Sequence, residues 1–220
     1  VRFMTSHPWD FSDEMIDVIA KYNNIMPSIH LPVQSGSNKV LKLMGRRYTK
    51  EKYIELFNKL KNKIPNVSIS TDIIVGFPKE TEEDFLETMD LVETCKFDNA
   101  FTYLFSPRKG TAAARIEDEF SDEVKRERLQ RLNKVVNKYF LESNRRLQSK
   151  VVDVLVENVN SNGNFDLYGY TDTNKLINFN GSKNLIGQIV KVKVVFAKTW
   201  SLDGELYNEW SINPSRGSSW

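Results

Sequence analysis

Residues 67–80 read VSISTDIIVGFPKE, a run of branched apolar side chains that ends in a glycine turn. Successive side chains of a strand point to opposite faces. The more apolar face of this strand would consist of Ile69, Thr71, Ile73 and Val75. The other face would carry Ser70, Asp72 and Ile74. Because an unpaired carboxylate inside a sheet is costly, we expect Asp72 either to contact a polar ligand or to belong to a satisfied core network.

The stretch SIHLPVQ, residues 28–34, shows the same alternation, with polar positions at Ser28, His30 and Gln34. Two successive strands therefore share a polar face, which a purely structural parallel barrel would fill with branched apolar residues. The strands lead into the glycine turns QSGS and GFPKE. These turns lie at the edge where parallel α/β folds bind their substrates, so the sequence predicts a binding site there.

Strand-like and helical patterns alternate through the first half of the chain, which predicts an α/β fold with a parallel sheet. Strands are expected at residues 1–5, 28–33, 67–75 and 99–106, and helices at 12–22, 38–44, 49–61 and 81–95. Ser12, Thr49 and Thr81 stand at helix starts as acceptors for first-turn amides. Four strands are too few for a closed (βα)₈ barrel, so an open sheet and the latter part of a barrel remain as alternatives.

The pattern changes after a long amphipathic helix predicted over residues 121–146. Five short strands, separated by turns rich in Asn, Gly and Ser, predict a small, closed, all-β barrel of the OB-like kind. We therefore expect an α/β domain at residues 1–146, a barrel domain at 147–209 and a flexible tail at 210–220.

The 220-residue chain has one cysteine and two histidines, which limits its metal chemistry. Cys95, His7 and His30 are too few soft or imidazole ligands for an iron–sulfur cluster or a structural zinc site. We expect Cys95 to be a core residue. We expect His7 and His30 to have structural roles, with contact to a ligand as the alternative. No apolar run approaches the ~18 residues of a membrane span, and no export leader is visible, so we expect a cytoplasmic protein. Because Val1 falls within an expected strand, we also expect a fragment.

The formal net charge is +2, but the charges are unevenly distributed. Residues 121–150 hold nine basic and four acidic side chains, which either form a solvated helix face or contact phosphates. The candidate RNA contacts on this helix are Arg126, Arg131, Lys134 and Arg145. The aromatic side chains of the predicted barrel are either core or base-stacking surfaces. They are Phe165, Tyr168, Tyr170, Phe179 and Trp200.

Four motifs, taken in order, carry a resemblance to a known family. They are TSHPWDFSDEMI at residues 5–16, HLPVQSGSNKVLKLMGRRYTKEKY at 30–53, TDIIVGFPKETEEDF at 71–85 and FSPRKGTAAA at 105–114. Together they closely resemble the radical S-adenosylmethionine (SAM) methylthiotransferases, in particular the MiaB-type tRNA enzymes. The segment 147–207 resembles the TRAM domain with which these enzymes hold RNA.

The resemblance implies a fold and an activity for the full-length protein. The fold would be α/β, the C-terminal part of a partial (βα)₆ radical SAM barrel followed by the small TRAM barrel. The activity would add a methylthio group to C2 of N6-isopentenyladenosine, next to the anticodon of tRNA. It would use SAM, two 4Fe-4S clusters and an electron donor such as flavodoxin or ferredoxin.

The family's CxxxCxxC segment and N-terminal methylthiotransferase domain do not occur in this sequence. The resemblance therefore implies that this chain ligates neither cluster, contains no catalytic residue and is inactive alone.

The resemblance also implies where SAM binds. Gln34 and Asp72 would hold the ribose hydroxyls and Arg46 the methionine carboxylate, pairings that suit amide, carboxylate and guanidinium groups. A glycine allows the backbone to approach the adenine ring. The wall at that point would consist of Gly76, Phe77 and Pro78. The alternatives are that Arg46 is a surface cation beside Arg47 and that Gln34 only caps a turn.

Two other functions compete with this one. A relative that methylthiolates a ribosomal protein shares both the barrel and the TRAM domain, although HLPVQSGS and the SHP segment favour the tRNA enzyme. A protein of another class, a noncatalytic RNA-binding module, is what the isolated fragment would be.

Overall fold

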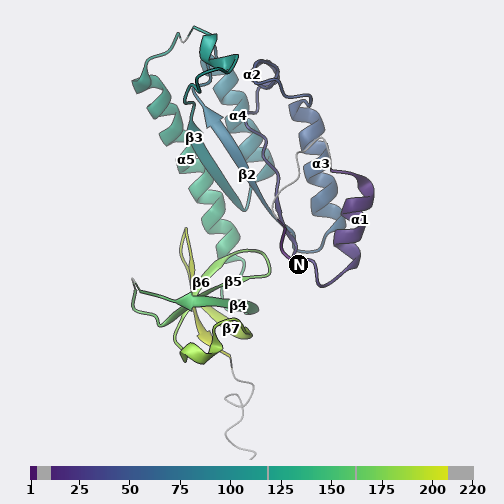
Figure 1. The fold of residues 1–220 in the computed structure, drawn as a ribbon, viewed down its shortest axis with the longest axis vertical. Coiled ribbons are helices and arrows are strands. Elements are labelled where there is room, and N and C mark those ends of the chain that lie inside the picture. The colour runs from purple at the N-terminus through teal and green to yellow at the C-terminus, as the bar shows by residue number, and fades with distance from the viewer. Residues whose placement is uncertain (4–10, 118, 162, 208–220) are drawn as a thin grey trace, which may run out of the picture. The chain divides into compact units, whose positions relative to one another are not determined.

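The computed structural model describes residues 1–3, 11–117, 119–161 and 163–207 (Figure 1). The chain divides into two compact units, Val1–Phe140 and Leu141–Trp220, each with its own hydrophobic core. The boundary falls inside helix α5 (Asp122–Arg145), which matches the helix predicted over residues 121–146. His7 and the tail predicted at 210–220 lie outside the described residues.

The first unit contains a three-stranded parallel sheet in the order β1-β2-β3. Its strands are β1 (Ser28–His30), β2 (Ser68–Val75) and β3 (Asn99–Leu104). The helices that precede α5 are α1 (Asp13–Lys21), α2 (Asn38–Leu43), α3 (Lys50–Lys63) and α4 (Glu82–Cys95). The predicted alternation of parallel strands and helices is therefore confirmed from residue 12 onward.

The strand expected at residues 1–5 is not a strand over Val1–Phe3, and residues 4 and 5 lie outside the described part of the chain. The carbonyl of Val1 accepts a hydrogen bond from the Met26 amide at 2.9 Å. The start of the chain is thus bonded to the turn that follows α1 and joins no sheet ladder, which is the reason the prediction was wrong for these residues.

One face of β2 packs against helices and the other does not. Ile69 and Ile73 are fully buried in a cluster with Phe57 of α3, Phe85 of α4 and Leu132 of α5. On the opposite face, Ser70, Asp72 and Ile74 remain partly exposed. The alternation predicted from the sequence is confirmed, and the polar face of the sheet stays accessible.

The predicted helix starts are confirmed by their capping bonds. Ser12, Thr49 and Thr81 each accept a hydrogen bond from the backbone amide three residues further on. Thr81 and Asp84 also form a reciprocal capping box, which satisfies two first-turn donors of α4. No helix in the described part of the chain is long and apolar enough to span a lipid bilayer.

The second unit folds into a closed barrel with the strand order β4-β5-β6-β8-β7. The strands are β4 (Val151–Val159), β5 (Leu167–Thr171), β6 (Leu176–Phe179), β7 (Ile189–Ala197) and β8 (Leu202–Leu206). Side chains from all five strands, including Val154, Ile177 and Val192, fill one core. The predicted five-stranded barrel is confirmed.

The barrel aromatics divide between core and surface. Phe179 is fully buried in the core, whereas Trp200 is largely exposed. Phe165, Tyr168 and Tyr170 are half-buried, and the two tyrosine rings meet edge to face at 6.4 Å between centroids. Phe179 is therefore a core residue, and base stacking stays a prediction for the other four rings.

In the first unit, the QSGS segment that follows β1 packs directly onto α4. The Gly36 amide donates to Thr88 Oγ1 at 2.9 Å, and Ser37 Oγ donates to Asp84 Oδ1 at 2.7 Å. A Cβ atom at Gly36 would lie 2.5 Å from the Glu87 carbonyl oxygen and 2.5 Å from Thr88 Cα. Residue 36 must therefore be glycine for the loop and the helix to meet.

We predict that Gly36→Ala lowers the free energy of unfolding by roughly 1–3 kcal/mol or more, because backbone atoms on both sides must move apart. Gly45→Ala is the matched control: Gly45 has φ +73° and nothing within 4 Å of an added Cβ, so only backbone strain of about 1 kcal/mol is expected. Urea denaturation of both variants measures the difference. Equal losses would show that the contact between the loop and α4 is not tight.

Candidate functional site

The polar face of β2 joins two of the residues singled out from the sequence. His30 Nε2 lies 3.3 Å from Asp72 Oδ2, and His30 Nδ1 lies 3.0 Å from Ser70 Oγ. The imidazole ring also meets Phe101 edge to face, with 5.9 Å between ring centroids. The Asp72 side chain is 26% exposed, so a histidine orients this carboxylate while a ligand can still reach it.

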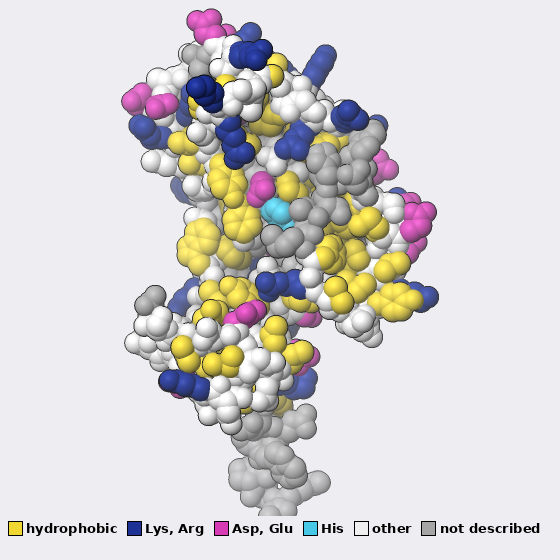
Figure 2. Space-filling view, in the orientation of Figure 1, with side chains coloured by type: hydrophobic (Ala, Val, Ile, Leu, Met, Phe, Trp, Pro, Cys, Tyr) yellow, Lys and Arg dark blue, Asp and Glu magenta, His cyan; other side chains and the backbone are white. Residues whose placement is uncertain are grey.

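Hydrophobic side chains surround these polar groups. Figure 2 shows the histidine and an acidic side chain side by side among apolar surface. Phe101 and Tyr103 of β3 contribute to this surface: both are about half exposed and stand opposite Asp72 and Ile74 in the strand register. Neither residue was predicted from the sequence, although alternation along β3 around the buried Ala100 could have indicated them.

Gln34 extends the sheet beyond the end of β1. Its backbone amide donates to the backbone carbonyl of Asp72 at 2.8 Å, and its backbone carbonyl accepts from the Ile74 amide at 2.9 Å. Gln34 has φ +71°, a left-handed conformation that costs a non-glycine residue about 1–2 kcal/mol. Strain of this kind is frequent at functional sites, and the backbone bonds fix Gln34 beside Asp72.

A cavity of about 350 Å³ lies at the carboxyl end of β2 and contains two further predicted residues. Arg46, which follows α2, lines it together with Ile74 and Phe77. Ile74 is two residues beyond Asp72 on the same strand face. The remaining lining residues are Leu43, Met44, Gly45, Thr111, Ala112 and Ala113. The cavity thus combines the guanidinium group of Arg46 with apolar walls, and one wall residue, Ile74, shares a face of β2 with Asp72.

Gly76 and Pro78 are buried in the GFPKE turn and do not line this cavity. Gly76 has φ +74°, and a Cβ there would lie 2.7 Å from Cγ of Lys125. Its amide donates to Glu80 Oε1 at 3.2 Å. In this structure the open side of Gly76 is filled by the Lys125 stem, so the glycine serves the turn and its packing.

A buried acid–guanidinium contact supports the turn, and no sequence pattern predicted it. Glu80 and Arg128 of α5 are each 2% exposed, with 3.6 Å between Glu80 Oε1 and Arg128 Nη1. Arg128 also donates to the Glu80 carbonyl at 2.8 Å and to Glu82 at 3.1 Å. Its guanidinium carbon lies 4.8 Å from the centre of the Phe120 ring. Arg128 is therefore a structural cation and not a solvated one.

The four predicted RNA contacts have different surroundings. Arg131 donates to Glu82 at 2.7 Å and approaches Glu127 at 3.4 Å, so its charge is already paired. Arg126 pairs with Asp122 at 3.6 Å on an exposed turn of α5. Lys134 and Arg145 are exposed, Arg145 within the second unit. Lys134 is thus the clearest candidate in the first unit.

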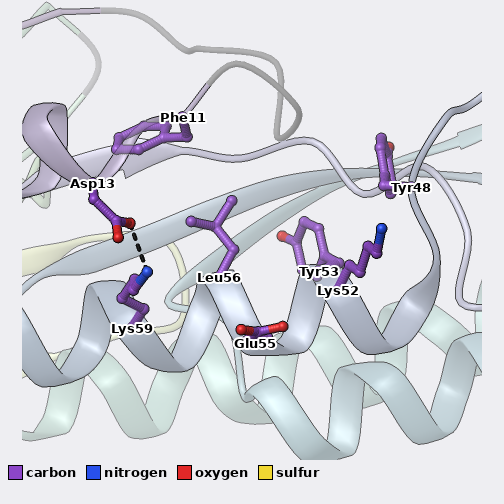
Figure 3. Close-up of a pocket in the computed structure, with 8 residues that line it drawn as sticks. All are labelled: Phe11, Asp13, Tyr48, Lys52, Tyr53, Glu55, Leu56 and Lys59. Carbon is purple, nitrogen blue, oxygen red and sulfur yellow. Dashed lines mark hydrogen bonds and ion pairs between the residues drawn. The ribbon is translucent and has the colours of Figure 1, made fainter.

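A second cavity, of about 190 Å³, runs along α3 and is drawn in Figure 3. Asp13 and Lys59 form an ion pair at its edge, with 2.6 Å between Oδ1 and Nζ. The hydroxyls of Tyr48 and Tyr53 donate to the backbone carbonyls of Val33 and Leu31, and burial raises the pKa of Tyr48 to about 12. These tyrosines fix the segment that follows β1, and their role is structural.

Cys95 is buried, and burial raises the pKa of its thiol to about 12. It is a core residue, as predicted. Within the described residues no group of three or more His, Cys, Asp or Glu side chains lies close enough together to hold a metal ion.

Comparison with known proteins agrees with both units. The profile of the radical SAM superfamily matches residues 1–92, and that of the TRAM domain matches residues 145–207. Among solved structures, coproporphyrinogen III oxidase (HemN) from Escherichia coli, described as a radical SAM enzyme, superimposes with a TM-score of 0.52 at 16% identity. That match covers 87% of this chain and 45% of the oxidase and supports the fold alone. Each profile thus matches residues of one unit, the radical SAM profile in the first and the TRAM profile in the second.

Similar curated proteins share one named activity. The chain is 56% identical over 209 residues to the tRNA-2-methylthio-N(6)-dimethylallyladenosine synthase of Bacillus mycoides. It is 54% identical to the synthase of the same name from Bacillus cytotoxicus. Each match covers 95% of this chain and 41% of the relative. The chain thus spans about two fifths of the length of the curated relatives it matches.

The buried Glu80 predicts a pH dependence of stability. Burial raises the pKa of Glu80 from 4.5 to about 7, so between these values the folded state keeps a proton that the unfolded state has released. Stability should therefore fall as the pH rises from about 4.5 to 7, by on the order of 3 kcal/mol. Urea denaturation at pH 5 and pH 8 measures this loss, which Glu80→Gln should largely abolish.

The exposed Glu55 provides a control for this experiment, because Glu55→Gln should leave the pH dependence unchanged. Parallel pH profiles for the wild type and Glu80→Gln would mean that Glu80 stays ionised beside Arg128.

Proposed function

We propose that this chain is the SAM-binding and RNA-binding C-terminal part of a tRNA methylthiotransferase. The full-length enzyme would add a methylthio group to C2 of N6-isopentenyladenosine next to the anticodon. The observation that carries the proposal is an oriented, accessible carboxylate, Asp72, on the same face of β2 as Ile74, which lines the cavity together with Arg46 and Phe77. The 54–56% identity to the Bacillus synthases supports this reaction over others of the superfamily.

The donor set fits SAM. A ribose diol donates two hydrogen bonds, which an ionised carboxylate such as Asp72 accepts, and a guanidinium such as Arg46 pairs with an amino-acid carboxylate. Phe77 and Ile74 supply apolar walls for a purine ring. Gln34 is held beside Asp72 by two backbone hydrogen bonds and would complete the ribose contact.

The remaining parts of the enzyme are proposed to lie outside this sequence. SAM and two 4Fe-4S clusters would supply the radical and sulfur-transfer chemistry, with flavodoxin or ferredoxin as the electron donor in the cytoplasm. With only one cysteine, this chain would ligate neither cluster and would be inactive alone. Its own residues would bind SAM, keep water from the site and hold the RNA.

His30 has a positioning role in this proposal. Its two ring nitrogens contact Ser70 and Asp72 at 3.0 and 3.3 Å, which fixes the carboxylate toward the open face of the sheet. Phe101 and Tyr103 would cover the bound ligand from the β3 side. Excluding water in this way strengthens the hydrogen bonds that remain.

The SAM site is tested in the full-length enzyme. Asp72→Asn should weaken SAM binding by roughly 1–3 kcal/mol, because a charged acceptor is lost, and should reduce methylthiolation of isopentenylated tRNA. Equilibrium dialysis with labelled SAM and mass spectrometry of the tRNA nucleosides measure the two effects. Asp13→Asn, which removes an exposed carboxylate of α1, should change neither; unchanged SAM affinity in Asp72→Asn would make the Asp72–His30 pair purely structural.

We also propose that the anticodon stem-loop of tRNA contacts the barrel, residues 147–209, and the exposed basic residues of α5. The TRAM match at residues 145–207 and the basic composition of α5 support this. Because Arg131 is already paired with Glu82, Lys134 and Arg145 should contribute more to phosphate binding than Arg131 does.

Lys134→Gln should therefore lower the affinity of the chain for any tRNA alike and reduce the slope of log affinity against log salt by about one. Arg131→Gln should reduce this slope less. The exposed Lys21 of α1 serves as the control, since Lys21→Gln should leave both quantities unchanged. Filter binding at several salt concentrations gives the slopes, and equal slopes for wild type and Lys134→Gln would leave α5 with no part in RNA binding.

A further inference from the structure

The barrel unit has a cavity of about 450 Å³ that lies apart from the proposed SAM site. It is formed by strands β7 and β8 together with the residues just before β5 and just after β6. The residues that matter for its chemistry are Phe165, Asn180, Val195, Phe196, Asp203 and Glu205. Its volume falls within the roughly 300–1,000 Å³ of small-ligand sites.

A β-bulge builds the apolar wall of this cavity. Val194 pairs with Gly204 and Phe196 pairs with Asp203, so Val195 is an extra residue in β7. Regular alternation would bury one of two successive side chains, but Val195 and Phe196 are both exposed, Phe196 by 53%. Bulges re-aim side chains in this way. The barrel thus presents an aromatic ring outward beside a hollow.

The polar side of the cavity is the carboxylate of Asp203. The side chain is only 15% exposed, and Oδ2 pairs with Lys198 Nζ at 2.6 Å. Oδ1 is buried from water, and no described residue donates a hydrogen bond to it. A buried acceptor without a donor costs about 1–3 kcal/mol, which a ligand N–H group would recover.

The carboxylates that line the cavity disfavour a phosphate, and the lysines near them leave the cavity close to neutral, which suits an uncharged base. Two carboxylates, Asp203 and Glu205, line it and would repel a phosphate group. Lys198 neutralises Asp203, and Lys193 stands opposite Glu205 in the register of β7 and β8. An aromatic wall combined with a buried acceptor matches an unpaired nucleobase, which has a flat ring and N–H donors on one edge.

We propose that this cavity binds one unpaired nucleobase of RNA that carries an amino group, with guanine preferred. Phe196 stacks on the base, and Asp203 Oδ1 accepts from its Watson–Crick edge, where guanine presents two adjacent N–H donors. Uracil lacks the amino donor. The inference rests on the RNA binding proposed above and adds a site that discriminates among bases.

The test uses the 220-residue chain and four labelled single-stranded RNA heptamers, with uridines flanking a central G, A, C or U. Fluorescence anisotropy should show the G heptamer binding about tenfold more tightly than the U heptamer, as expected for one carboxylate–base contact. Asp203→Asn should reduce this ratio to about twofold or less with U binding retained.

A second variant keeps the test independent of any folding defect in Asp203→Asn. Phe196→Ala, at an exposed position, should weaken all four heptamers about tenfold by removing the stacking surface, and it should leave the salt slope unchanged because no phosphate contact is lost. Ile189→Ala is the matched control, since Ile189 is 72% exposed on the same strand and lies outside the cavity. It should bind all four heptamers as the wild type does.

Two outcomes would overturn the inference, and they differ in what they say of the proposed function. Measurable, salt-dependent binding with equal affinity for all four heptamers, unaffected by both variants, rejects the base site and leaves the proposed function standing. Failure of the wild-type chain to bind any heptamer or tRNA rejects both.

Discussion

The carboxylate of Asp84 holds together the edge of the sheet on which the first site depends. It accepts hydrogen bonds from Ser37 Oγ and Lys39 Nζ, both at 2.7 Å, and from the Thr81 amide at 2.9 Å. Burial alone would raise the pKa of Asp84, but these donors outweigh it and lower the pKa below its usual value. One ionised group thus caps α4 and fixes the loop between β1 and α2, which contains Gln34, while Arg46 follows α2.

The asymmetry of the sheet explains why its carboxyl edge is open to the proposed ligand. Because α3, α4 and α5 bury the same face of β2, the opposite face is not needed for the core and can carry Ser70 and Asp72. His30 contacts both polar side chains, Ser70 and Asp72, and within the described residues no apolar layer covers them. The polar network and the ligand site, which the sequence left as alternatives, are therefore compatible in one arrangement.

Features of the fold that depend on local sequence could be predicted. Features that depend on contacts between distant parts of the chain could not. The two-residue period of β2 placed Asp72 on the accessible face, and Thr81 marked the start of α4. The burial of Arg128 depends on contact with Glu80, 48 residues earlier in the chain, so no local pattern distinguishes it from its solvated neighbours. Arg131 was an apparent free cation for the same reason. The left-handed backbone of Gln34 likewise follows from its bonds to β2.

The bulge in β7 had a sequence signal that alternation rules alone do not interpret. The run VKVVFA, residues 192–197, places four apolar residues in succession, which a strand with one buried face cannot accommodate without exposing some of them or shifting register. The structure shifts register and exposes two. In the proposed RNA binding, this outcome separates two tasks. Exposed lysines and arginines would supply affinity that depends on salt and not on sequence. A buried carboxylate, which repels phosphate, would contribute only where a base presents N–H donors. A slightly acidic barrel that follows a basic helix in the sequence is therefore consistent with a module that selects a base while charge elsewhere binds the RNA backbone.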